Sequence, residues 1–184
     1  MMEDERGNYG FKLVFWGLLI SVLYFRLHGF NIIPDFLGYI AIFVGLGSTK
    51  ELSSQFELSR IAVLILVPFS LADIYEPPTG QITFWPISVL SSILYLVFTW
   101  FLLGGLVETN RNYDNPSLSS LAEKVQIAAA FVLLFPAIIA FQLSLIFPPL
   151  AIIITAMGLL VGIIELYVVY HTAETVENKH ENHL

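Results

Sequence analysis

Six apolar stretches, separated by polar or proline-bearing segments, limit this chain to a membrane-embedded helical fold. A helix needs about 20 apolar residues to cross the hydrocarbon core of a bilayer. Lipid offers no hydrogen bonds to the backbone, so each stretch is expected to be helical. The predicted spans are 11–27, 32–47, 61–75, 86–107, 125–147 and 150–170.

We therefore predict an all-α fold, an integral membrane bundle of six transmembrane helices arranged as three hairpins. The helices form one domain over residues 1–173, and residues 174–184 form a polar cytoplasmic tail. Charged residues make up only 12% of the 184 residues, against about a quarter in a typical soluble domain. This balance makes the lipid bilayer the expected main partner of the chain.

The first three spans are short, and the second is the least secure. Pro34 is placed to start span two, which either crosses fully or is a re-entrant segment. The connection 48–60 alternates polar and apolar residues, which favours either a short interfacial helix or a helical extension of span three.

The basic residues predict the orientation of the spans. Lys and Arg near span ends are retained on the cytoplasmic side. Only Arg26 falls on the opposite side from the other seven, which are Arg6, Lys12, Lys50, Arg60, Arg111, Lys124 and Lys179. We therefore predict a multi-pass protein of the plasma (cell) membrane with both termini in the cytoplasm.

Small and polar residues of a membrane helix are expected to face its neighbours. At helical spacing, five spans carry such a stripe, and three acidic residues lie on these stripes: Asp35, Asp73 and Glu165. Four glycines on the same stripes are predicted helix-packing positions: Gly38, Gly45, Gly158 and Gly162. The Gly158-x-x-x-Gly162 pair favours packing within the chain over a dimer contact.

Asp35 has two interpretations. It follows Pro34 in the first helical turn, where the helix dipole stabilises an anion, so it could simply start span two. Alternatively, it belongs to a ligand or ion site reached from outside, with His28, Asp73 and Glu76 at similar depth.

Glu165 lies within span six, about one and a half turns from its inner end. An ionisable residue inside a span is a candidate functional residue. The alternatives are that Glu165 pairs with Lys124, with Arg60 or with a tyrosine of an adjacent helix, or that it is protonated.

Other polar patterns carry weaker signals. His171 and Glu174 have a spacing that could hold a metal, but an exposed helix end is the simpler interpretation. His180 and His183 have such a spacing too, but a flexible tail is the simpler interpretation there. Pro136 is interpreted as a helix kink. No catalytic triad, phosphate loop or zinc helix is present, so we predict no enzyme, no cofactor and no metal site.

Cysteine is absent, which excludes disulfides and thiolate chemistry from the chain. No cluster of Lys or Arg could follow a nucleic-acid backbone, so nucleic acid is not an expected partner.

The segment Ile33-Pro34-Asp35-Phe36-Leu37-Gly38-Tyr39 resembles a segment of small multi-pass bacterial membrane proteins without assigned function. The resemblance covers about a tenth of the chain and implies that Pro34, Asp35 and Gly38 act together. Size and topology are also similar to the S-components of energy-coupling-factor vitamin transporters, which carry an Ala-x-x-x-Ala patch on their first span. Span one contains no alanine.

Two functions follow as expectations. The first is a non-enzymatic accessory or regulatory membrane protein that contacts another membrane protein, favoured by short loops and the absence of a soluble domain. The second is a small-solute or ion transport component whose acidic residues line an internal site.

Overall fold

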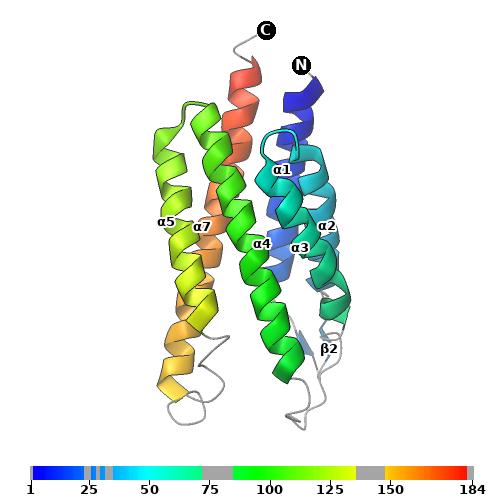
Figure 1. Ribbon diagram of the computed structural model, residues 1–184, viewed down its shortest axis with the longest axis vertical. Helices are drawn as coiled ribbons and strands as arrows, with labels where there is room; N and C mark the ends of the chain where they lie inside the picture. The colour runs from blue at the N-terminus through cyan, green and yellow to red at the C-terminus, as the bar shows by residue number, and fades with distance from the viewer. Residues whose placement is uncertain are drawn as a thin grey trace.

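Six helices run lengthwise in the computed structural model, which describes residues 2–22, 26–27, 30–31, 35–71, 85–135 and 148–181 (Figure 1). The helices are α1 (Met2–Val22), α2 (Asp35–Thr49), α3 (Ser54–Leu71), α4 (Trp85–Asn112), α5 (Pro116–Phe135) and α7 (Pro148–Glu181). Between α1 and α2, strand β1 (Arg26–Leu27) pairs antiparallel with β2 (Phe30–Asn31). The described parts of the chain are thus helical, as the sequence predicts, apart from this strand pair. The strand β1 lies within the predicted span 11–27, so the prediction of helix is wrong at Arg26 and Leu27.

Four of these helices, α3, α4, α5 and α7, are long and apolar enough to cross a membrane. α2 is apolar but has only 15 residues. At 1.5 Å per residue it is about 22 Å long, less than the ~30 Å of a bilayer core. The chain therefore has the helices of a membrane protein, with a short helix at the segment that the sequence marks as least secure.

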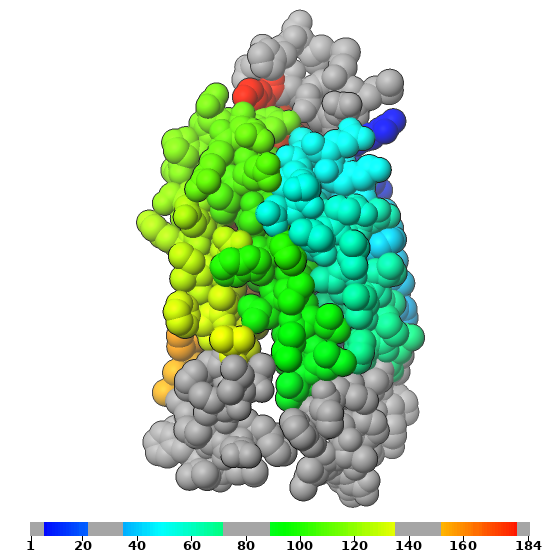
Figure 2. All heavy atoms as spheres, in the orientation of Figure 1, coloured from blue at the N-terminus to red at the C-terminus, as the bar shows by residue number. Residues whose placement is uncertain are grey.

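The helices close into a ring in which each packs against the next in the chain. The last helix, α7, returns to contact α1, and it also contacts α4. Figure 2 shows one face of the bundle, where α4 lies between α3 and α5. Both described chain ends, the α2–α3 connection and the α4–α5 connection lie at the same end of the bundle, called here the charged end (Figure 1).

Apolar side chains divide between the interior and the outer surface. Phe11, Phe56 and Phe98 are fully buried at the centre of the core. Large apolar side chains elsewhere are exposed, such as Phe131 at 73% and Ile152 at 72%. Exposure on this scale would be unfavourable in water but is expected for residues that face lipid.

The described helices extend beyond the predicted spans at the charged end. α3 begins at Ser54, so the extension of span three is the correct interpretation of the 48–60 segment over its second half. Ser53 caps this helix, since its hydroxyl accepts a hydrogen bond of 3.1 Å from the Gln55 amide. The segment between predicted spans four and five is mostly helical, with only a short turn between Asn112 and Pro116.

The last described helix extends past the predicted end of span six. Residues 174–181, which the sequence assigns to a polar tail, continue α7 as helix. Val176 is fully buried, and Lys12 of α1 makes an ion pair of 3.2 Å with Glu177. These contacts hold the end of α7 against the bundle.

Two glycine pairs bring α1 and α2 into close contact. A methyl group at Gly38 would lie 2.6 Å from the Gly17 carbonyl oxygen, and one at Gly45 would lie 2.5 Å from the Gly10 carbonyl oxygen. Separations this short leave no room for a side chain, so the backbones of the two helices touch. The stripe of small residues on α2 therefore faces α1.

Candidate functional site

Glu165 occupies the buried face of α7. Its neighbours at helical spacing, Val168, Val169 and Thr172, are also buried, and Glu165 itself is only 2% exposed. The opposite face of the same helix is apolar and exposed, with Leu160 at 58% and Ile163 at 53%. The helix thus turns its carboxylate away from lipid and into the bundle.

Tyr95 of α4 connects this carboxylate to other polar groups of the interior. Glu165, Tyr39 and Asp35 each interact electrostatically with the Tyr95 phenol, and Thr99 lies one turn along α4. The ring of Tyr95 packs against Phe98, with centroids 5.6 Å apart. Side chains from α2 and α7 therefore lie within electrostatic range of Tyr95, and the four residues Asp35, Tyr39, Tyr95 and Glu165 are called here the Glu165 cluster.

One oxygen of the Glu165 carboxylate is unsatisfied. Its Oε1 atom is buried and has no hydrogen-bond partner among the described residues. Burying a polar atom without a partner costs about 1–3 kcal/mol, and a charged group costs more. Such a group is expected where a ligand, an ion or a proton completes it.

Of the partners predicted for Glu165, the basic residues Arg60 and Lys124 lie elsewhere, whereas a tyrosine lies within range. Arg60 pairs with Glu57 at 3.6 Å and lies over the Phe43 ring at 4.3 Å. Lys124 is on the exposed side of α5. Tyr95, on an adjacent helix, is the predicted kind of partner that lies within electrostatic range.

Asp35 begins α2, where the helix dipole stabilises its negative charge. It is half-buried and interacts with Tyr95 across the bundle. Asp35 thus starts the helix, whereas the predicted site that it would share with His28, Asp73 and Glu76 involves residues outside the described ones.

The other predicted residues are the helix-packing glycines, which the structure describes in part, and several residues that lie outside the described ranges. Gly38 and Gly45 lie at the α1–α2 contact, whereas a methyl group at Gly158 would come no closer than 3.9 Å to Val132 of α5. Gly162 is half-buried on α7. Three predicted site residues lie outside the described residues: His28, Asp73 and Glu76. Pro136 and His183 lie outside them as well.

A polar network at the charged end went unpredicted. Asn110 of α4 donates a hydrogen bond of 2.8 Å to Thr172 of α7. Asn115 donates one of 3.1 Å to Thr175, and Lys179 donates one of 3.4 Å to the Asn112 carbonyl oxygen. The sequence signal is Thr172, Thr175 and Lys179 at helical spacing, in a segment that begins after the predicted end of span six at residue 170.

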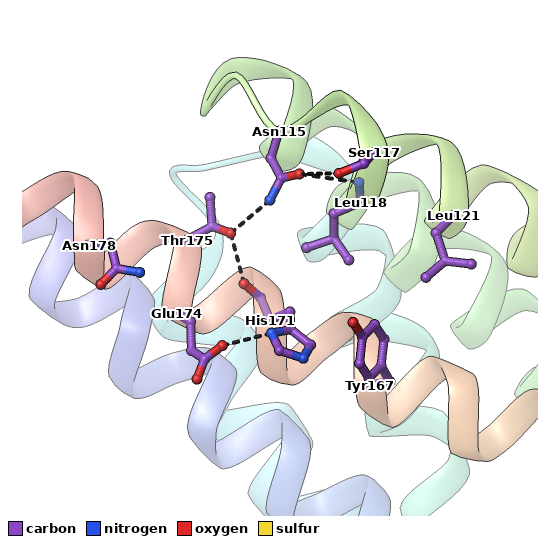
Figure 3. A pocket seen from close by; sticks show the side chains of 9 residues that line it. All are labelled: Asn115, Ser117, Leu118, Leu121, Tyr167, His171, Glu174, Thr175 and Asn178. Atoms are coloured by element: carbon purple, nitrogen blue, oxygen red, sulfur yellow. Dashed lines mark hydrogen bonds and ion pairs between the residues drawn. The ribbon is translucent and has the colours of Figure 1, made fainter.

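A groove of about 400 Å³ lies between α5 and α7 at this end (Figure 3). Its polar lining includes Asn115, His171, Glu174 and Thr175. His171 Nδ1 lies 2.7 Å from a Glu174 carboxylate oxygen, so these two side chains pair with each other. Within the described residues, no group of three side chains could hold a metal ion.

Comparison of the chain with protein-family models, with curated proteins and with solved structures found no match, so the site is interpreted from its geometry alone.

Proposed function

We propose that this protein is a component of small-solute or ion transport, non-enzymatic, whose binding site is the Glu165 cluster. One observation carries the proposal. The buried Glu165 carboxylate keeps an oxygen without a described partner, and it lies within electrostatic range of the Tyr95 phenol of α4.

The cost of this arrangement favours a function over a structural role. A hydrophobic side chain at position 165 would pack in the same interior without any desolvation penalty, as Val168 and Val169 do one turn away. A site that binds and releases its ligand needs a group that is unsatisfied when the ligand is absent. Glu165 meets that requirement, and Asp35 at the start of α2 lies within electrostatic range of the same Tyr95 phenol.

We further propose six crossings of the plasma membrane with both termini in the cytoplasm. The charged end supports this topology, because the two described chain ends and both charged connections gather there (Figure 1). Lys12, Lys50 and Lys179 lie at this end, whereas Arg26 lies on β1. The resemblance of residues 33–39 to small multi-pass bacterial membrane proteins agrees with this proposal and remains a prediction.

The transport proposal is tested by flux into proteoliposomes and by thermal stabilisation with a panel of small solutes. Glu165→Gln and Asp35→Asn are expected to lose solute-dependent flux and stabilisation while remaining folded. Glu177→Gln is the matched control, because Glu177 lies on the same helix, is partly exposed and makes a surface ion pair with Lys12. If both test variants behave like the parent protein with every solute, the proposal fails.

A second candidate is an accessory or regulatory protein that contacts another membrane protein. The observation in its favour is a second groove, of about 280 Å³, between α1 and α7 and lined in part by Phe15, Trp16 and Tyr170. Aromatic side chains that are exposed at a groove can anchor a partner helix. Purification in mild detergent at native expression is expected to yield a stoichiometric partner, and a protein without one would count against this candidate.

A further inference from the structure

The groove between α1 and α7, called here the α1–α7 groove, has an aromatic half and an ionic half. Phe15 and Trp16 of α1 and Tyr170 of α7 line the aromatic half. The Phe15 ring meets the Trp16 ring edge-on, with centroids 5.6 Å apart, and lies tilted against the Tyr170 ring at 5.7 Å. Trp16 is 58% exposed and Tyr170 is 47% exposed, so both rings offer surface to a ligand. Aromatic rings that face a pocket from several directions are suited to an organic ammonium group.

The ionic half lies one helical turn nearer the charged end and is lined by Lys12 of α1 with Glu174 and Glu177 of α7. Lys12 pairs with Glu177 at 3.2 Å, whereas Glu174 lies 2.7 Å from His171 Nδ1. A neutral imidazole that donates a hydrogen bond leaves the carboxylate its charge. Two carboxylates and one ammonium therefore give this half of the groove one net negative charge with a cation beside it.

This combination of charges complements a zwitterion. The groove has a volume of about 280 Å³, close to the ~300 Å³ of the smallest ligand sites, so it fits a lipid headgroup better than the length of a partner helix. Its charged half is also unsuited to the apolar face of such a helix, because a charge buried without a partner is costly. An exposed apolar surface continues from the groove toward lipid, since Ile163 and Leu159 precede Tyr170 at helical spacing and are 53% and 54% exposed.

We propose that the α1–α7 groove binds the headgroup of a zwitterionic phospholipid, with its ammonium between Glu174 and the aromatic rings and its phosphate at Lys12. A lysine ammonium has three donor hydrogens, so Lys12 keeps its ion pair with Glu177 while it contacts the phosphate. The acyl chains lie along the exposed apolar face of α7 that continues from the groove. This site is separate from the Glu165 cluster, and the inference does not depend on the transport function.

The test measures the lipids that the purified protein retains, by native mass spectrometry. Phosphatidylethanolamine is the probe, and phosphatidylglycerol with the same acyl chains is its control, because glycerol replaces ethanolamine on the same phosphate. Retention of one phosphatidylethanolamine is expected, about tenfold tighter than retention of phosphatidylglycerol. Equal retention of the two lipids would overturn the proposal.

Three variants assign the two ends of the headgroup. Glu174→Gln and Trp16→Leu remove partners of the ammonium, so each is expected to reduce the preference for phosphatidylethanolamine to about threefold or less. Lys12→Gln removes the partner of the phosphate, which both lipids carry, and is expected to weaken their retention equally. Because Glu174 and Trp16 lie on different helices, either variant alone tests the ammonium site where the other fails to fold.

Two control variants make the same chemical changes away from the groove. Glu123→Gln removes an exposed carboxylate of α5, and Trp100→Leu removes an exposed ring of α4. Both are expected to keep the preference of the parent protein. The same unchanged preference in Glu174→Gln and Trp16→Leu would overturn the proposal.

Two further outcomes would identify a different occupant of the groove. If soluble phosphoethanolamine binds as tightly as the lipid and displaces it, the groove holds a free solute. If a protein that is purified with the chain excludes phosphatidylethanolamine, the groove holds a partner helix. Either result overturns the assignment to lipid.

Discussion

Asn110 of α4 and Thr172 of α7 are joined by a hydrogen bond of 2.8 Å in the interior of the bundle, where Asn110 is fully buried and Thr172 is 1% exposed. Each side chain also bonds to its own helix. The Asn110 amide donates to the Leu106 carbonyl oxygen, and the Thr172 hydroxyl donates to that of Val168. This contact joins the two helices that carry Tyr95 and Glu165.

We predict that Thr172→Val lowers the free energy of unfolding by about 1–2 kcal/mol, because the buried Asn110 amide loses one of its two acceptors. Thermal unfolding in detergent measures the change. In a double-mutant cycle with Asn110→Leu, the coupling energy is expected to be about 1 kcal/mol. Ser120→Ala, at an exposed position of α5, is the control. A Thr172→Val protein that unfolds with the parent would show that the bond adds no stability.

A matched pair of glycine variants tests the α1–α2 contact. Gly38→Ala is expected to destabilise the protein by about 1–3 kcal/mol, because the added methyl group meets the Gly17 backbone at 2.6 Å. Gly158→Ala is expected to be neutral, or stabilising by up to about 1 kcal/mol, since its methyl group meets nothing closer than 3.9 Å. Unfolding temperatures of the two variants are compared directly, and equal values would contradict the close contact.

The α4–α5 turn depends on a left-handed residue. Asp114 has a φ of 56°, a conformation that Asp tolerates and β-branched residues avoid. Asp114→Val is therefore expected to cost about 1–2 kcal/mol of stability. Asp114→Gly is expected to change stability little, since the ion pair of Asp114 with Lys179 is long, at 4.0 Å, and exposed. If Asp114→Gly is destabilised instead, the side chain of Asp114 contributes to the stability of the turn.

The absence of cysteine allows the topology to be tested with single-cysteine variants. In intact cells, a membrane-impermeant maleimide is expected to label Arg26→Cys but not Lys50→Cys or Asp114→Cys. After permeabilisation all three are expected to react. Labelling of Lys50→Cys in intact cells would refute the proposed orientation. Failure of Arg26→Cys to react from outside would indicate that α1 and α2 do not reach the outer surface.

Hydrophobic periodicity predicted the helical interior of this protein but not the ends of the helices. Glu165 was placed on an inward face by its spacing with Gly158 and Gly162, and it is buried in the structure. The helical character of residues 54–60 and 171–181 was harder to predict because polar residues there alternate with buried ones such as Phe56 and Val176. Hydropathy detects contact with lipid, whereas these segments are stabilised by contact with one another.

The composition of the Glu165 cluster was only partly predictable. Helical spacing predicts inward stripes that hold Asp35 and Glu165 on separate helices, but one sequence does not show which stripes meet. That depends on the order of helices around the ring, in which α7 contacts both α1 and α4. Asn110 was missed because a single amide near a span end resembles an ordinary loop residue until its partner Thr172 is known.

The closure of the ring by α7 also has a consequence for biosynthesis. α7 follows the other five described helices in the chain, so it leaves the ribosome after them. Until it arrives, the faces of α1, α4 and α5 that it covers must contact lipid or an insertion chaperone. The Glu165 carboxylate reaches the interior of the bundle only together with α7.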